Sequence, residues 1–145
     1  MKRVINFSLA ATLILSSSID LTAQEISLFN SDGEAVAYIA DDMTIYLWEG
    51  DPVAYLSNDN GEWHIYGFNG SHLGWYEEGI IYNHRGDAVG AQKNATNMIT
   101  SIEGIKSIKS MQPMKSIKEM APMKPMLSSS WSRIPLVIFL RAGED

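Results

Sequence analysis

The side chains best suited to acid–base or metal chemistry in this chain are three histidines, His64, His72 and His84. An imidazole acts as a general base or a metal ligand only when carboxylates or other ligands lie within hydrogen-bond or coordination distance. The histidines stand six residues before, two after and two before a glycine of the repeat described below, so they occupy three different positions in that repeat. The spacing therefore predicts no common site, and we expect no catalytic residue, metal ion or cofactor.

Aromatic side chains are the second group that could bind a ligand, because they stack on sugar rings and grip peptides. The Trp and Tyr residues are concentrated between residues 38 and 82, and packing between strands accounts for most of them. Trp48 and Tyr76 lie just outside the shared apolar positions of the repeat. Together with Trp63, they are the residues that we predict for ligand binding.

A unit that occurs four times must position these side chains. Each copy has an aliphatic residue five positions before a glycine, an aromatic residue four before it, Val or Leu three after it, and Ala or Gly four after it. The structural glycines of the repeat are Gly33, Gly50, Gly70 and Gly86. A period of 16 to 20 residues holds two strands, so each copy is predicted to be a β-hairpin. Apolar residues on both faces favour an all-β fold, with four quasi-repeated hairpins closed into a pseudo-four-fold rosette.

The glycine of each copy also predicts how the hairpin pairs. Dipeptides such as Asn69-Gly70 favour a two-residue type I′ turn. In that register the aromatic residue faces the Val or Leu, and the aliphatic residue faces the Ala or Gly. Small residues let backbones approach closely, so Gly74 and Gly90 are predicted to lie at a crowded central axis.

A second periodicity follows the hairpins, with apolar residues at every third position from Ile99 to Met126. An α-helix would scatter such a stripe around its axis, whereas polyproline II has three residues per turn and suits the prolines of this segment. Because exposed apolar side chains are costly, we expect this polyproline-II-like segment to pack on the hairpins, with its lysines near acidic residues. The alternative is an arm that binds a partner.

These patterns divide the chain into four parts. Residues 1–23 have a basic start, an apolar stretch and a Leu-Thr-Ala triplet, which is typical of a secretory signal peptide and too short for a membrane span. Residues 24–98 form the hairpin module and residues 99–131 the period-three segment. Residues 132–145 are predicted to be strand-like, because the apolar run Ile134–Leu140 has the length of a strand that could cap an open sheet edge.

Charge and cysteine content narrow the class of partner. The hairpin module carries twelve Asp and Glu residues against Arg85 and Lys93, so we expect neither nucleic acid nor an anionic membrane as its partner. The chain has no cysteine, and an exported product without disulfides must be held together by packing alone.

Three stretches of the hairpin module resemble the 4-fold beta flower proteins of bacteria. They are DGEAVAYI from Asp32, IYLWEGDPVAYL from Ile45 and YGFNGSHLGWY from Tyr66. The resemblance covers residues 28–131 and implies the same rosette of hairpins. It implies no activity, ligand or site residue.

These features predict an exported protein, whether periplasmic, secreted or on the cell surface. We expect it to be a non-catalytic binding or structural module of the bacterial envelope, with an envelope protein, a peptide or a glycan as its partner. The alternative is a small hydrolase or metal-dependent enzyme that uses the histidines and aspartates. Histidines beside two carboxylates in a cleft would favour the enzyme, and dispersed surface histidines would favour the binding module.

Overall fold

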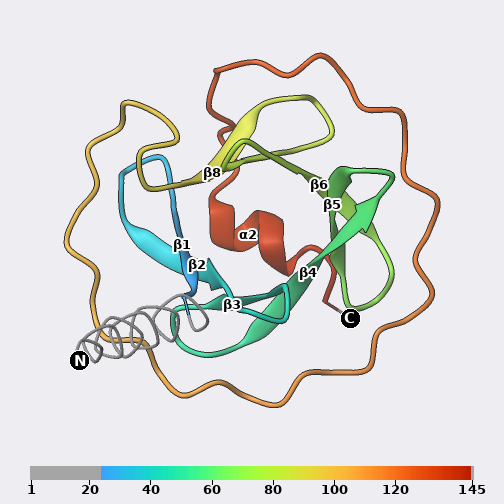
Figure 1. Cartoon of the computed structure of the whole chain (residues 1–145), viewed down its shortest axis with the longest axis horizontal. Coiled ribbons are helices and arrows are strands. Elements are labelled where there is room, and N and C mark those ends of the chain that lie inside the picture. Colours follow the sequence, from blue (N-terminus) through green and yellow to red (C-terminus); the bar gives the residue numbers. More distant parts are fainter. Residues whose placement is uncertain (1–23, 145) are drawn as a thin grey trace, which may run out of the picture.

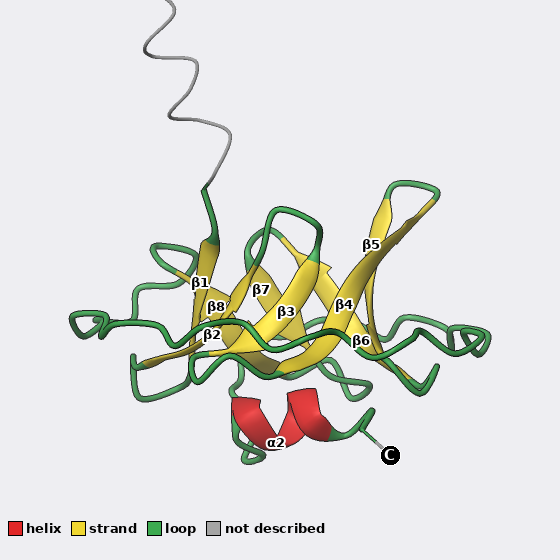
Figure 2. Cartoon of the chain, turned by 90° about the horizontal axis from the view of Figure 1, so that it is seen from below, coloured by secondary structure: helices red, strands yellow, loops and turns green. Residues whose placement is uncertain are grey.

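The computed structural model describes residues 24–144; residues 1–23, to which the predicted signal peptide belongs, lie outside the described residues, as does Asp145. The described part has eight strands and one short helix, which Figures 1 and 2 show from two directions. Their bounds are β1 (Ile26–Phe29), β2 (Ala35–Ile39), β3 (Thr44–Leu47), β4 (Pro52–Asp59), β5 (Glu62–Gly67), β6 (His72–Glu77), β7 (Ile80–Tyr82), β8 (Ala88–Gln92) and α2 (Leu136–Arg141).

The strands form a closed antiparallel barrel in which each strand pairs with the next and β8 pairs with β1. The four predicted hairpins are β1–β2, β3–β4, β5–β6 and β7–β8. Closure leaves no strand edge in the barrel without a partner. The predicted all-β fold and its closure are therefore confirmed.

Of the two residue pairings predicted for each hairpin, one is confirmed and the other is wrong. The aliphatic residue of each copy pairs with the small residue, as Ile45 does with Ala54 and Ile65 with Gly74. The aromatic residue faces the position two after the glycine, not three, because each hairpin contains a bulge at that point. The predicted pairing of the aromatic residue with Val or Leu is wrong.

The turn explains this bulge. The N–H of Gly33 donates to the carbonyl of Asn30 at 3.0 Å, and Gly33 has φ +79° while the preceding Asp32 has a negative φ. This is the arrangement of a type I turn followed by a glycine bulge, not a type I′ turn, which requires two residues with positive φ. Glu49 and Arg85 precede the glycines of their turns as Asp32 precedes Gly33. Both would be unfavourable in a type I′ turn, but this position has a negative φ in a type I turn and accommodates them.

The interior of the barrel is filled by aliphatic side chains from all eight strands. The residues five before each repeat glycine, Leu28, Ile45, Ile65 and Ile81, are each 0% exposed. Figure 1 shows α2 at the centre of the ring of strands, and Figure 2 shows it on one side of them, so the helix covers one end of the barrel. Its Leu136, Phe139 and Leu140 are buried in the same core.

The apolar run 134–140 is thus a helix for most of its length, and the predicted strand is wrong. A closed barrel offers no open edge to which another strand could be added. Leu136, Phe139 and Leu140 have the spacing of positions i, i+3 and i+4, which places them on one face of a helix. That face closes the end of the barrel.

Residues 99–130 form neither helix nor strand and run around the outside of the barrel, as the orange segment of Figure 1 shows. Four backbone N–H groups, nine residues apart, each donate to the carbonyl of a repeat glycine at 2.8–2.9 Å. The pairs are Ser101–Gly33, Ser110–Gly50, Glu119–Gly70 and Ser128–Gly86. The nine-residue repeat of the segment therefore matches the hairpin repeat of the barrel, one unit to each turn.

The side of the segment that faces the barrel is not the apolar one. Its Ile and Met side chains from Ile99 to Met126 are each 90–98% exposed, so the expectation that they pack on the hairpins is wrong. A Cβ on Gly33, Gly50, Gly70 or Gly86 would collide with a carbonyl oxygen of the segment, so the backbone approaches the turns where only glycine allows it. Backbone contact and lysines hold the segment, and its apolar side chains point away.

Candidate functional site

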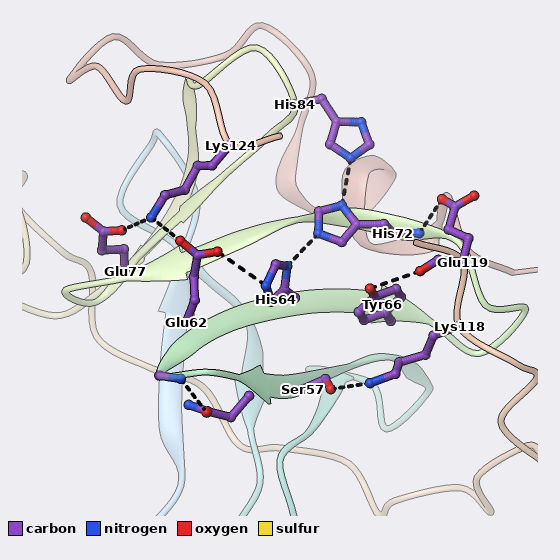
Figure 3. Close-up of polar contacts among 12 residues, drawn as sticks. Ser57, Glu62, His64, Tyr66, His72, Glu77, His84, Lys118, Glu119 and Lys124 are labelled. Carbon is purple, nitrogen blue, oxygen red and sulfur yellow. Dashed lines mark hydrogen bonds and ion pairs between the residues drawn. The ribbon is translucent and has the colours of Figure 1, made fainter. Parts of the chain in front are cut away.

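The three histidines lie next to one another in a row on the outer wall of the barrel (Figure 3). His64 is on β5, His72 begins β6, and His84 is in the turn between β7 and β8. Nδ1 of His64 is 2.9 Å from Nε2 of His72, and Nδ1 of His72 is 2.9 Å from Nε2 of His84. His64 and His72 are buried, and His84 is exposed.

This row, which we call the histidine chain, corrects the expectation that the histidines have no common site. The bulge in the β5–β6 hairpin pairs His72 with Tyr66, so both lie on the same face of the sheet as His64, two residues from Tyr66. In the predicted register, without the bulge, His72 would pair one position further along β5 and face the other side. The bulged turn was therefore the feature that the spacing of the histidines did not reveal.

Both ends of the histidine chain meet polar groups. Nε2 of His64 is 3.4 Å from a carboxylate oxygen of Glu62. The other carboxylate oxygen of Glu62 is 2.6 Å from Nζ of Lys124, which also binds Glu77 at 2.7 Å. At the other end, His72 and His84 line a pocket of about 410 Å³ together with Ser71, Asn83 and Arg85.

Burial controls the protonation of the middle ring. Burial is the largest cause, and together with like-charge repulsion from the neighbouring His84 and His64 it lowers the pKa of His72 to about 4. The hydrogen bond from Lys124 lowers the pKa of Glu62, so this carboxylate remains ionised beside His64. The arrangement is suited to holding and moving protons.

A single metal ion is a poorer match to this arrangement. The two ring nitrogens of His72 point to two different histidines, so one ion cannot be bound by all three rings. Within residues 24–144, no group of three or more His, Cys, Asp or Glu side chains has a geometry that could hold a metal ion.

Two of the three predicted aromatic residues come together. Trp63 and Tyr76 pair across β5 and β6 and line a pocket of about 450 Å³ with Glu62, Glu77 and Lys124. The hydroxyl of Tyr76 donates to Gln92, and both rings pack against the barrel core.

Trp48 lies apart from that pocket. It packs edge-on against Tyr38, and the segment that encircles the barrel covers it, with Nζ of Lys106 5.3 Å from the centre of its ring. Of the predicted ligand-binding residues, only Trp63 and Tyr76 share a site.

The apolar stripe of the encircling segment is a further candidate site. The sequence pattern predicts that this stripe faces the barrel, whereas it is exposed. We call the ten exposed side chains of the encircling segment the apolar belt: Ile99, Ile102, Ile105, Ile108, Met111, Met114, Ile117, Met120, Met123 and Met126. Beneath the belt, four lysine ammonium groups lie 4.3–5.9 Å from tyrosine ring centres. Lys106 and Lys109 also bind Glu25, each at 2.7 Å. The lysines thus attach the segment and leave the belt free.

A family model described as "4-fold beta flower protein" matches residues 26–140. The chain belongs to this family. The match includes the whole barrel, the encircling segment and most of α2, so all three are parts of the beta flower chain. Searches of curated proteins and of solved structures found no match. No helix in the described part of this beta flower protein is long and apolar enough to cross a membrane.

The histidine chain predicts that the stability of this beta flower protein depends on pH. His72 has a pKa of about 4 when folded and about 6.5 when unfolded, so the unfolded state binds more protons between these values. The titration of His72 should therefore lower the free energy of unfolding by about 3 kcal/mol as the pH falls from 6.5 to 4. Urea denaturation at several pH values measures this loss.

The His72→Gln variant distinguishes the contribution of His72 to the pH dependence of stability from that of the carboxylates. Glu62, with its lowered pKa, loses its contribution only below its ordinary pKa of 4.5. Between pH 6.5 and 5 the His72→Gln variant should therefore show a smaller slope than the native protein, with a difference that approaches about 1.4 kcal/mol per pH unit near pH 5. Equal slopes for the two proteins would contradict the assignment to His72.

Proposed function

We propose that this protein is a non-catalytic binding module of the bacterial envelope, and that the apolar belt binds a protein partner. One observation carries the proposal: ten large apolar side chains, each at least 90% exposed, occur at every third position of the segment that encircles the barrel in Figure 1. Contiguous exposed apolar surface of this kind marks interaction sites in soluble proteins.

The energy available at the belt is large. Burying one Ile or Met side chain contributes about 1.5–3 kcal/mol. Four buried belt residues would therefore contribute about 6–12 kcal/mol before the costs of association are subtracted. The charged groups beneath the belt already have partners, because Lys106 and Lys109 bind Glu25 and Lys124 binds Glu62 and Glu77. A partner is thus expected to contact mainly apolar side chains.

The shape of the belt favours a concave partner. The segment that carries the belt runs around the outside of the molecule (Figure 1), so two copies side by side would touch along only a short arc. A short arc brings few belt residues into contact, whereas a stable interface buries roughly 1,000 Å² or more. A protein with an apolar groove or ring can follow the curve and cover several belt residues at once. A peptide or glycan would instead use the pocket of Trp63 and Tyr76, which offers far less apolar surface.

We also propose that the encircling segment has the polyproline II conformation. The support is its three-residue period, the outward direction of every third side chain and the absence of helix or strand between residues 99 and 130. A segment of this kind is extended before it binds, so little conformational entropy is lost when a partner covers it.

Export is the remaining part of the proposal. The basic start and the apolar stretch of residues 1–23 support a signal peptide that is removed after Ala23, so that the mature protein begins at Gln24 and acts outside the cytoplasm. The intact mass of the protein recovered from the envelope fraction tests this. A mass that includes residues 1–23 would contradict it.

Site-specific photo-crosslinking in cells tests the belt. A photoreactive residue at Met111 or Met120 should give one adduct of defined mass, whereas the same residue at Ile138 should give none. Ile138 is a suitable control because it is 58% exposed and apolar but lies on α2, away from the belt. An adduct of twice the mass of the protein would identify a second copy and contradict the proposed partner, as would equal crosslinking at Ile138.

A variant with a less apolar belt tests whether the adduct depends on the belt. Replacing Ile105, Ile108 and Met114 by Ser should abolish the adduct formed from Met111. Because these side chains are exposed, the same changes should alter the free energy of unfolding by no more than about 0.5 kcal/mol each. A variant that still forms the adduct would show that the belt does not bind the partner.

A small hydrolase is the second candidate, and the histidine chain beside Glu62 is the observation that favours it. In that case His84 would act as the base, because it is exposed and faces a pocket that also contains Ser71. Hydrolysis of chromogenic esters, phosphates or glycosides that is lost in the His84→Ala variant would favour the enzyme over the binding module.

A further inference from the structure

The histidine chain has the connectivity of a proton conductor. Three imidazole rings are joined end to end by two N–N contacts of 2.9 Å, and each contact requires one N–H donor and one bare nitrogen acceptor. The free ends of the chain are Nε2 of His64, which faces Glu62, and Nδ1 of the exposed His84.

Counting protons shows what the chain can hold when it is neutral. Three neutral rings have three N–H groups, and the two links use two of them. The third N–H lies at one of the two ends. If all three rings are protonated on Nε2, it faces Glu62; if all three are protonated on Nδ1, it lies at His84. The carboxylate of Glu62 favours the first arrangement, because it accepts a hydrogen bond from Nε2 of His64.

One added proton fits without breaking a link, and a second does not. With four N–H groups, both ends are protonated and each link still has one donor and one acceptor. With five N–H groups, one link must have hydrogen atoms on both of its nitrogens, and that contact is repulsive. The geometry therefore allows the chain to hold one extra proton and no more.

We propose that the histidine chain is a relay that takes up one proton at His84 and transfers it to His64, beside Glu62. The incoming proton binds Nδ1 of His84, and the Nε2 proton of His84 passes to Nδ1 of His72. The Nε2 proton of His72 then passes to Nδ1 of His64. Each ring forms one N–H bond and the first two each break one, so the positive charge ends on His64.

The surrounding charges favour this direction. The ionised Glu62 is 3.4 Å from Nε2 of His64 and stabilises a proton at that end. Burial disfavours a charge on His72, so this ring transmits the proton without keeping it. The other titratable or charged groups around the chain come from the encircling segment, from β5 and from the β7–β8 turn. From the encircling segment, the carboxylate of Glu119 accepts a hydrogen bond from the backbone N–H of His72 at 2.7 Å, Lys124 binds Glu62, and Lys118 lies over the ring of Tyr66. The remaining two groups are the hydroxyl of Tyr66 on β5 and Arg85 in the β7–β8 turn, which lines the pocket.

The relay connects two pockets that otherwise have no residue in common. His84 lines the pocket with Ser71 and Arg85, whereas Glu62 lines the pocket with Trp63 and Tyr76. A proton released by an acid or by a ligand in the first pocket would change the charge beside the second. The salt bridge of Lys124 to Glu62 lies at that end, so the relay also reaches an attachment point of the encircling segment. None of this depends on what the apolar belt binds.

Nitrogen NMR of the whole protein, labelled with ¹⁵N at the histidine rings, tests the relay. Ring ¹⁵N shifts report which nitrogen carries a proton, so a titration from pH 8 to pH 5 follows each ring. In the native protein the His64 and His84 signals should shift with one shared midpoint and a total uptake of one proton. During this step His72 and His84 should change from the Nε2–H to the Nδ1–H form. Separate midpoints, or uptake of two or more protons above pH 5 with both links intact, would overturn the proposal.

Two substitutions provide the control. In His72→Gln the link is broken, and His64 and His84 should titrate with different midpoints. In His84→Asn, at the exposed end where a change of fold is not expected, His72 should no longer change from Nε2–H to Nδ1–H between pH 8 and pH 5. A change of His72 that persists in His84→Asn would show that protons reach the chain by another way, and would overturn the assigned direction.

Discussion

A chain that ends at Arg133 is expected to be unfolded in water at 25 °C, although it keeps all eight strands and the apolar belt. Leu136, Phe139 and Leu140 of α2 are only 1%, 9% and 0% exposed, and they cover one end of the barrel. Burial of each such side chain contributes about 1.5–3 kcal/mol. Losing three of them, and exposing the barrel interior, removes most of the roughly 5–15 kcal/mol that stabilises a typical domain. Far-UV circular dichroism and urea denaturation measure the result.

Two substitutions in α2 provide the control for this truncation. Leu140→Ala should lower the free energy of unfolding by about 2–5 kcal/mol, because it leaves a cavity in the core. Ile138→Ala, on the exposed side of the same helix, should change it by less than about 0.5 kcal/mol. A chain ending at Arg133 with the urea midpoint of the full-length protein would show that α2 is not part of the stabilising core.

The truncation also separates α2 from the encircling segment. The sequence pattern predicts that loss of everything after Met98 is damaging because buried Ile and Met side chains are lost. These side chains are exposed, so the damage is expected to arise mainly from α2. The encircling segment is held by backbone hydrogen bonds and by ion pairs such as Lys106–Glu25 and Lys124–Glu62. Its attachment should therefore weaken as salt is added, in contrast to an apolar contact.

The repeat predicts the hairpins and the closed barrel because its pattern is set by the core. An aliphatic residue such as Ile45 and a small residue such as Ala54 must meet on the inner face in every copy, whatever the turn. The turn type is less determined, since Asn-Gly and Asp-Gly suit both a type I′ turn and a type I turn with a glycine bulge. Glu49 and Arg85, in the other two copies, were the available signal for the bulge. With a type I′ turn, His72 would face the other side of the sheet from His64, so the predicted turn type also excluded the histidine chain.

For the encircling segment, the sequence pattern does not determine which side faces the barrel. A period of three indicates that one side chain in three points the same way, but it does not indicate whether that direction is inward or outward. Hydrophobicity suggests inward, yet the barrel core is already complete and its outer wall presents tyrosines and carboxylates. Lysines such as Lys106 match that wall, so the lysine face turns inward and the apolar face turns out. The nine-residue spacing of the contacts with the four turns is the sequence feature that corresponds to this fit, and the three-residue period alone does not reveal it.

The small residues of the repeat give the second large effect, and the structure ranks their substitutions. A Cβ on Gly74 would collide with the backbone carbonyl oxygen of Tyr82 and lie 3.1 Å from Cζ of Phe139. At Gly90 the nearest atom is the end of the Leu136 side chain, 2.7 Å away, which can rotate. Gly74→Val should therefore cost about 3 kcal/mol or more, and Gly90→Val about 1–3 kcal/mol.

Gly104 is the matched control, because its nearest neighbour would be Nε1 of Trp48 at 3.8 Å, an ordinary contact, so Gly104→Ala should leave the melting temperature almost unchanged. Thermal melts of the three variants under one set of conditions test the order, with Gly74 the most damaging and Gly104 the least. The order follows from what each new Cβ meets: a strand backbone that is fixed by its pairing partners at Gly74, a side chain that has another rotamer at Gly90, and an ordinary van der Waals contact at Gly104. If Gly74→Val had the same melting temperature as Gly104→Ala, the strands around Gly74 would have to lie further apart than the pairing of β6 and β7 allows.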